Sequence, residues 1–147
     1  MRRIYLTISK PLEIIVVDAN PILSGLIKGN SIKIFWKKDI KLFATTEFTV
    51  EEIKKYIPRL AHKAGLMEEI LFFGLALLPL KIYSKEFYMD KIEQAKEKIG
   101  KRDPKDIDIL ALVLKLNAPL WTNDRDFEDT GIELFSTAAL FKFLEDG

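Results

Sequence analysis

The chain has 147 residues, of which 48% are hydrophobic, 23 are basic and 22 are acidic. This length and composition predict a single domain over residues 1–147, with enough apolar side chains for a two- or three-layer core. The formal net charge of +1 excludes a global cationic field for bulk nucleic-acid binding, so any such contact requires a local patch. Cysteine is absent, which excludes disulfides and thiolate zinc sites and indicates a reducing cytoplasm.

Neither the start of the chain nor its apolar stretches suggest export or membrane insertion. Residues 1–10 lack the apolar stretch and cleavage site of a signal peptide. We expect residues 1–12 to form a short N-terminal extension or an edge strand. The longest apolar stretches, 70–80 and 109–114, are much shorter than the roughly 20 residues that cross a bilayer. We therefore expect a soluble cytoplasmic protein with no membrane contact.

Apolar runs and helix signals alternate along the chain. In chain order, the expected strands are Ile14–Val17, Leu42–Ala44, Leu80–Tyr83, Leu120–Thr122 and Ile132–Phe135. Helices are expected from the cap Asn20 to Gly25 or Gly29, from Ser31 to Trp36, from Thr49 to about Leu60, from Leu66 to Leu78, from Ser84 to Ile99, from Asp103 to Leu116, and after the cap Ser136.

This alternation, without Asn-Gly hairpin signals, predicts an α/β/α three-layer sandwich with a central, mainly parallel sheet. The run Ile14–Val17 is apolar at every position, which is typical of a central strand covered on both faces. The helix body Ile107–Leu116 is apolar on nearly every side, so we expect it in the core. Ligands of such sheets bind at the carboxyl ends of the strands.

Four acidic residues are expected to meet at that edge. Asp18 directly follows the first strand and Asp124 closely follows the strand 120–122, while Glu52 and Asp106 lie in the first turns of adjacent helices. Carboxylates packed this closely raise one another's pKa values unless a cation neutralises them. Oxygen ligands alone favour Mg²⁺ or Mn²⁺, as one ion or two, and the expected chemistry is phosphodiester hydrolysis by metal-activated water.

Two of these acids also have a purely structural interpretation. Glu52 could complete a capping box with Thr49, and Asp106 could simply favour its helix dipole. Glu51 and Glu52 point about 100° apart around a helix, so at most one of them is a direct ligand. We choose Glu52, with Glu51 as the alternative.

The acids near the strand ends also differ in whether a purely structural role explains them. Asp124 and Asp126 could be ordinary turn residues. Asp18 has no such explanation, because Asn20 is the better helix cap. Asp108 projects from another helix face than its neighbour two positions earlier, so we leave it outside the metal site.

Three stretches together resemble the PIN-domain family: IIVVDANPILSGL, FTVEEI and RDPKDIDILALVLKLNAPLWTNDRDF. Their order and spacing span nearly the whole chain. The resemblance implies a Rossmann-like sandwich whose acidic pocket binds Mg²⁺ or Mn²⁺ and cleaves single-stranded RNA. By this resemblance the metal-binding and catalytic positions are Asp18, Glu52, Asp106 and Asp124. It further implies an additional metal-binding acid and two polar supporting residues, which are Asp126, Asn20 and Thr122.

The chain departs from the usual family pattern at the doubled Glu51-Glu52 and at Asp108, where a small or apolar residue is commoner. Many relatives are VapC-type toxins of toxin–antitoxin pairs, and others are solitary. The resemblance therefore implies an endoribonuclease that could be such a toxin, with an antitoxin protein as partner. The alternative is a catalytically silent PIN-like module that binds RNA or a partner protein.

Three further features indicate possible contacts. Arg125 lies between two candidate acids and is placed to bind substrate. The first half is rich in lysine, with Trp36, Phe43 and Tyr56 interspersed, which could contact phosphates and stack a base, although a solvated helix face explains most of these lysines. Segment Leu66–Leu78 has more apolar surface than one helix face needs. Core packing is the default explanation, a dimer or partner-protein surface is the functional alternative, and of these two surfaces we expect a homodimer.

Overall fold

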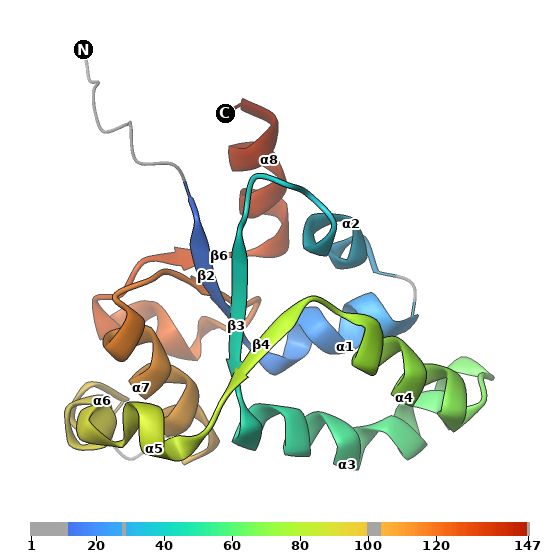
Figure 1. Cartoon of the computed structure of the whole chain (residues 1–147), viewed down its shortest axis with the longest axis horizontal. Coiled ribbons are helices and arrows are strands. Elements are labelled where there is room, and N and C mark those ends of the chain that lie inside the picture. Colours follow the sequence, from blue (N-terminus) through green and yellow to red (C-terminus); the bar gives the residue numbers. More distant parts are fainter. Residues whose placement is uncertain (1–11, 28, 100–103, 147) are drawn as a thin grey trace.

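The structure is a computed structural model that describes residues 12–27, 29–99 and 104–146. Its described residues form one parallel sheet in the order β4-β3-β2-β5-β6 (Figure 1). The strands are β2 (Ile14–Val17), β3 (Leu42–Thr46), β4 (Leu80–Tyr83), β5 (Leu120–Trp121) and β6 (Leu134–Phe135). The predicted fold class and the central position of the first strand are confirmed. Residues 1–11, most of the expected extension or edge strand, lie outside the described residues.

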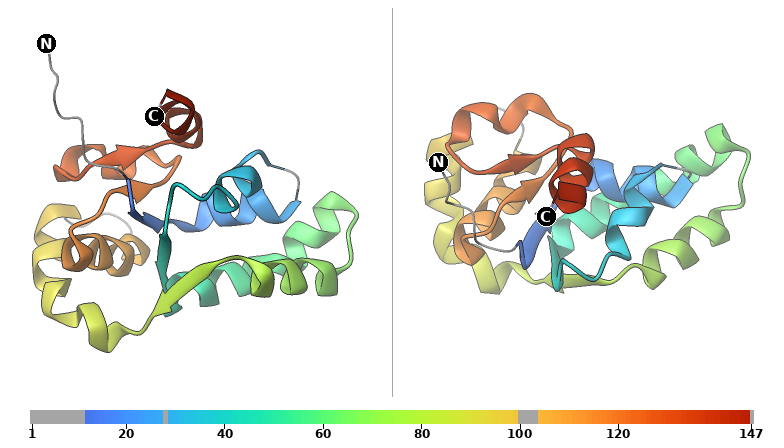
Figure 2. Two further views of the ribbon diagram at one scale, coloured as in Figure 1. Left: turned by 45° about the horizontal axis from the view of Figure 1, so that its top comes forward. Right: turned by 90° about the horizontal axis from the view of Figure 1, so that it is seen from above.

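Helices cover both faces of the sheet (Figures 1 and 2). One layer contains α1 (Ala19–Ile27), α2 (Ser31–Phe35), α3 (Glu47–Ala64), α4 (Glu68–Leu77) and α8 (Thr137–Asp146). The other contains α5 (Lys85–Tyr88), the 3-10 turns η2 (Met89–Lys91) and η3 (Arg125–Thr130), α6 (Ile92–Ile99) and α7 (Lys105–Leu116). Across these described ranges, no helix combines the length and apolar character needed to cross a bilayer.

The central strand β2 explains why its sequence shows no polar alternation. Successive side chains of a strand point to opposite faces. Ile15 and Val17 are fully buried in the core that contains Trp121, while Val16 is fully buried in the other core with Leu120. Both faces of β2 therefore lie under a helical layer, as the all-apolar run predicted. The middle of α7 is likewise buried in the second core.

The start of α3 differs from the prediction. The helix begins at Glu47, because Thr46 is the N-cap and its hydroxyl accepts a hydrogen bond from Thr49 N at 2.8 Å. The predicted capping box between Thr49 and Glu52 is therefore wrong, since Thr49 already lies inside the helix. The helix also continues beyond the predicted end to Ala64.

Other boundaries differ for local reasons. Helix α1 begins at Ala19, so Asn20 is not its cap, and the Asn20 side chain instead accepts a hydrogen bond from Asn123 N at 3.1 Å. The single helix predicted over 84–99 is divided by the 3-10 turn η2. The expected start at Asp103 lies outside the described residues. The predicted cap Ser136 is confirmed, because its hydroxyl accepts a hydrogen bond from Ala139 N at 3.1 Å.

Replacing Thr46 with alanine should destabilise the fold. The change removes the α3 cap and also leaves the buried Thr49 hydroxyl without its 2.7 Å partner. We expect a loss of about 1–2 kcal/mol in the free energy of unfolding, measured by urea denaturation. Ser136→Ala is the matched control, because it removes an exposed cap from α8 and should cost about 0.5–1 kcal/mol. Equal losses for the two variants would contradict this account of α3.

Candidate metal centre

The pairing of β2 with β5 brings two candidate acids to one edge of the sheet. The two strands are parallel, with Val17 opposite Trp121, and Asp18 N donates to Trp121 O at 3.0 Å. Just beyond β5, the Thr122 hydroxyl donates to Asp18 Oδ2 at 2.8 Å and accepts from Asp124 N at 3.0 Å. Thr122 thus connects Asp18 to Asp124.

A second set of hydrogen bonds anchors the loop that carries Asp124. The Asn123 side chain accepts from Thr137 N at 2.9 Å and donates to the Thr137 hydroxyl at 3.1 Å. The same hydroxyl accepts from Trp121 Nε1 at 3.0 Å. Because Trp121 is fully buried and Thr137 begins α8, the loop is tied to the core and to the last helix.

Three carboxylates converge beside this loop. Asp106, Asp124 and Asp126 each bring one oxygen to within 4.8 Å of the oxygens of the other two. Asp106 lies in the first turn of α7 and is only 9% exposed. Asp124 is the N-cap of η3, where its Oδ1 accepts a hydrogen bond from Asp126 N at 2.9 Å. We call these three residues the acidic cluster.

The acidic cluster fits a hard divalent cation. Its donors are all carboxylate oxygens, which suit Mg²⁺ or Mn²⁺. Mg²⁺ holds its ligands at about 2.1 Å, so two of them lie at most roughly 4.2 Å apart, and a small side-chain adjustment brings the cluster into that range. Three negative charges this close are also unfavourable without a cation.

Asp18 lies outside this group of three but is electrostatically coupled to it. Burial raises the pKa of the Asp18 carboxyl above its ordinary value of 3.8. Hydrogen bonds from Thr122 and from Ala19 N lower the pKa, and the charge on Asp124 raises it. The net effect is a raised pKa, so ionised Asp18 destabilises the folded chain. A nearby cation would reduce this destabilisation.

Glu52 reaches the edge of this region but pairs with lysines. Its side chain is 17% exposed and lies 3.3 Å from Lys105 Nζ and 3.8 Å from Lys55 Nζ. Glu51 instead pairs with Lys54 at 3.6 Å and is well exposed. Of the two glutamates, Glu52 faces the start of α7, next to Asp106. Its role as a metal ligand stays a prediction.

The remaining predicted residues lie around the acidic cluster. Arg125 is strongly exposed and lies 3.3 Å from Glu128 in the same 3-10 turn, so its role in substrate binding stays a prediction. Asp108 accepts a hydrogen bond from the buried Tyr88 hydroxyl at 2.6 Å; burial, and then this hydrogen bond, raise the pKa of Tyr88. Asp108 thus contacts α5, and its exclusion from the metal site stays a prediction.

The sequence reasoning missed three polar residues around the site. Asn123 and Thr137 anchor the Asp124 loop, and an Asn directly before an Asp in a turn was an available signal. Lys105 carried a different signal, because a cation in the first turn of a helix is unfavourable for the dipole.

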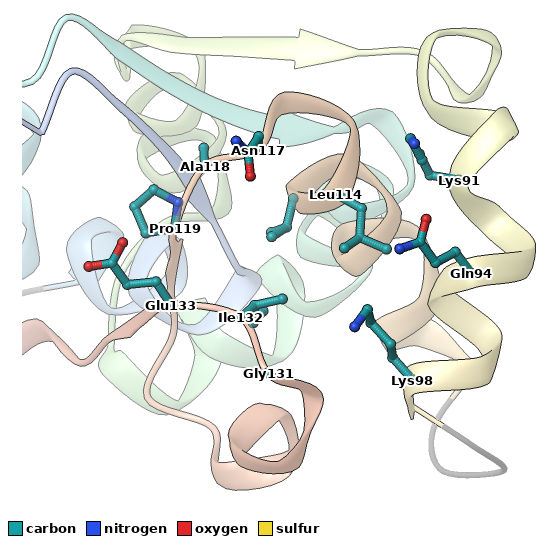
Figure 3. A pocket seen from close by; sticks show the side chains of 11 residues that line it. Lys91, Gln94, Lys98, Leu114, Asn117, Ala118, Pro119, Gly131, Ile132 and Glu133 are labelled. Atoms are coloured by element: carbon teal, nitrogen blue, oxygen red, sulfur yellow. The ribbon is translucent and has the colours of Figure 1, made fainter.

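A separate cavity of about 360 Å³ lies before the amino ends of β5 and β6 (Figure 3). Lys91, Gln94 and Lys98 line one side, and Pro119 and Glu133 lie across from them. None of the candidate acids lines this cavity. It is therefore distinct from the acidic cluster, which lies at the carboxyl edge.

Comparisons with known proteins agree with this geometry. The family model described as "PIN domain" matches residues 16–143, which include every predicted site residue. No curated protein matches the chain in sequence.

Several solved structures share the fold. PAE2754 from Pyrobaculum aerophilum is 15% identical, with a TM-score of 0.68 over 92% of this chain and 98% of that one. DNA-bound VapBC from Salmonella typhimurium is 16% identical, with a TM-score of 0.65 over 85% and 98%. VapC20 from Mycobacterium tuberculosis, a sarcin-ricin loop cleaving toxin, is 18% identical, with a TM-score of 0.57 over 80% and 95%.

Divalent cations should stabilise the protein through the acidic cluster. We expect Mg²⁺ or Mn²⁺ to raise the melting temperature, because a ligand that binds the native state shifts the unfolding equilibrium. Asp106→Asn should weaken the metal affinity derived from this titration by at least about 10- to 100-fold. The control Glu133→Gln, at the opposite edge, should titrate as the wild type does. An Asp106→Asn titration that overlays the wild type would exclude the cluster as the metal site.

Asp18→Asn should stabilise the metal-free protein at neutral pH. Because the folded-state pKa of Asp18 is raised, its contribution to stability falls as the pH rises from 3.8 through the raised value. The advantage of the variant should therefore be absent in acid and develop toward neutral pH in EDTA-containing urea denaturations. Asp90→Asn should show the opposite sign, since Lys115 lowers the Asp90 pKa. A neutral-pH loss of stability in Asp18→Asn would contradict the burial cost.

Proposed function

Because the chain belongs to the PIN-domain family, we propose that it is a metal-dependent endoribonuclease that hydrolyses phosphodiester bonds of single-stranded RNA. The observation that carries the proposal is the convergence of Asp106, Asp124 and Asp126 at the carboxyl edge of a parallel sheet. This is the edge where α/β sheets bind their ligands.

The side chains have distinct roles in this proposal. Asp106, Asp124 and Asp126 would hold Mg²⁺ or Mn²⁺, and Asp18 and Glu52 are the further metal-binding acids of the proposal. A bound ion supplies an activated water and stabilises the charge that develops on the phosphate. Thr122 keeps Asp18 and Asp124 in register, and Asn20 holds the loop between them through Asn123.

The carboxylates also determine the order of binding. Without a cation, three acidic side chains and Asp18 would repel the phosphates of RNA. Productive substrate binding therefore follows metal binding. Arg125, next to two acids of the cluster and strongly exposed, is placed to contact a phosphate of the incoming strand.

The partners of the chain follow from its relatives and its surface. A solved structure that shares this fold is the DNA-bound VapBC of Salmonella typhimurium, a toxin–antitoxin complex. By analogy, we include an antitoxin partner in the proposal. Ile70, Phe73 and Leu77 are exposed along one face of α4 at helical spacing, which supports a homodimer that covers them. A cytoplasmic location is part of the same proposal.

Cleavage of a labelled, unstructured RNA tests the proposed reaction. We expect cleavage in Mg²⁺ or Mn²⁺ that EDTA abolishes. Asp124→Asn retains the capping oxygen for Asp126 N but removes a charge, so it should reduce the cleavage rate by about 100-fold or more. Asp18→Asn should also abolish cleavage, and Glu133→Gln, far from the cluster, should retain wild-type activity.

Two outcomes would overturn the assignment. One is wild-type cleavage by both Asp18→Asn and Asp124→Asn. The other is an RNA panel that stays intact with either metal, which would favour the alternative of a catalytically silent module that binds RNA or a partner protein.

A further inference from the structure

A basic and aromatic surface adjoins the acidic cluster. It consists of Lys55 and Tyr56 on α3 and Lys105 at the start of α7, and we call it the basic flank. Lys105 Nζ lies 3.3 Å from Glu52 and 6.0 Å from the centre of the Tyr56 ring. Lys105 directly precedes Asp106 of the acidic cluster in the first turn of α7. The basic flank therefore begins one residue from the acidic cluster.

The position of Lys105 is unusual for a lysine. The first turn of a helix has a positive dipole end, which disfavours a cation there. Glu52 on α3 compensates by pairing with Lys105 across the two helices, and it also lies 3.8 Å from Lys55. Glu52 is largely buried, so it holds the flank in place. The charges of Glu52, Lys55 and Lys105 sum to +1, in contrast to the three negative charges of the acidic cluster.

The charged ends of the flank are accessible. The side chains of Lys105 and Lys55 are 52% and 77% exposed. Lys54 pairs with Glu51 within α3, as Lys55 does with Glu52, and both pairs have the i,i+3 spacing of a solvated helix face. The contact of Lys105 with both Glu52 and Tyr56 instead links two elements at the border of the acidic cluster.

Tyr56 adds an aromatic surface to the same region. The residue is 42% exposed, so part of its side chain is open to solvent. Aromatic side chains beside phosphate-binding cations stack the unpaired bases of single-stranded nucleic acid. The stacking is sequence-tolerant and requires a base that is not paired in a duplex.

We propose that the basic flank binds the nucleotide next to the scissile phosphodiester, with Lys105 and Lys55 at a phosphate and Tyr56 stacked on the base. The choice of single-stranded RNA as the ligand rests on the proposed function. The flank would supply the local attraction that a chain with net charge +1 does not supply globally. It also selects single strands over duplexes, since only an unpaired base can stack on Tyr56.

Equilibrium binding measurements test the basic flank independently of RNA cleavage. Each protein carries Asp18→Asn so that the RNA stays intact, and fluorescence anisotropy reports the affinity for a labelled unstructured RNA in Mg²⁺ at several salt concentrations. Lys105→Ala and Lys55→Ala should each weaken binding and reduce the slope of log affinity against log salt by about 0.7, because each removes one phosphate contact on a single strand.

Tyr56 has a different expected signature. Tyr56→Leu should weaken binding to the single strand by about tenfold with an unchanged salt slope, while Tyr56→Phe should retain the affinity. Binding to a duplex of the same sequence should not change in Tyr56→Leu.

Matched controls lie elsewhere on the molecule. Lys41 forms a comparable 3.2 Å ion pair with Glu13 at the amino ends of β2 and β3, and Phe143 is an exposed aromatic residue on α8. Lys41→Ala and Phe143→Leu should bind as the parent protein does.

The outcomes distinguish this inference from the proposed reaction. If the otherwise unmodified chain cleaves RNA but the flank variants bind like their parent, the inference alone fails. If the chain cleaves no RNA but the flank variants show the expected losses, the proposed reaction fails and the flank stands as a surface that binds single-stranded RNA, without the placement next to a scissile bond. The flank would be overturned if the parent protein bound neither the single-stranded nor the duplex RNA, or if the Lys41 and Phe143 variants showed equal losses.

Discussion

The parallel pairing of β2 with β5 is the constraint on which the site depends. It joins strand ends more than a hundred positions apart in the chain, and the Thr122 hydroxyl completes the junction by its hydrogen bond to Asp18. The same hydroxyl accepts a hydrogen bond from Asp124 N, which fixes the path of the chain after β5. Along this path Asp124 and Asp126 lie close to Asp106 on α7. A shift of this pairing by one residue would turn every side chain of β5 to the other face.

The site concentrates charge that the fold alone does not neutralise. Buried Trp121 and the polar contacts of Asn123 with Thr137 hold the Asp124 loop, so the three carboxylates cannot easily separate. Burial of Asp18 adds to this cost and raises its pKa. Such preorganisation is unfavourable for the empty fold but favourable for a bound cation. Stability and proposed activity thus depend on the same charges.

Several elements could be predicted from sequence because their signals are local. The run Ile14–Val17 is apolar on both faces, and its central position follows from burial on both sides. The α3 start could not be predicted in the same way, because Thr46 and Thr49 are both suitable caps by sequence. Only the end of β3, which extends to Thr46, decides between them. The division of 84–99 by a 3-10 turn also lacks a local signal such as Gly or Pro.

The sequence by itself determined the fold class, the strands and the list of acids, because apolar periodicity and residue type act over a few neighbouring positions. Only the tertiary structure decided how those acids divide. It groups Asp106, Asp124 and Asp126, leaves Asp18 linked to them through Thr122, and turns Glu52 toward Lys105. These relations join residues from different helices and strands. They depend on the packing of α3 and α7 against the sheet edge, which no local pattern encodes.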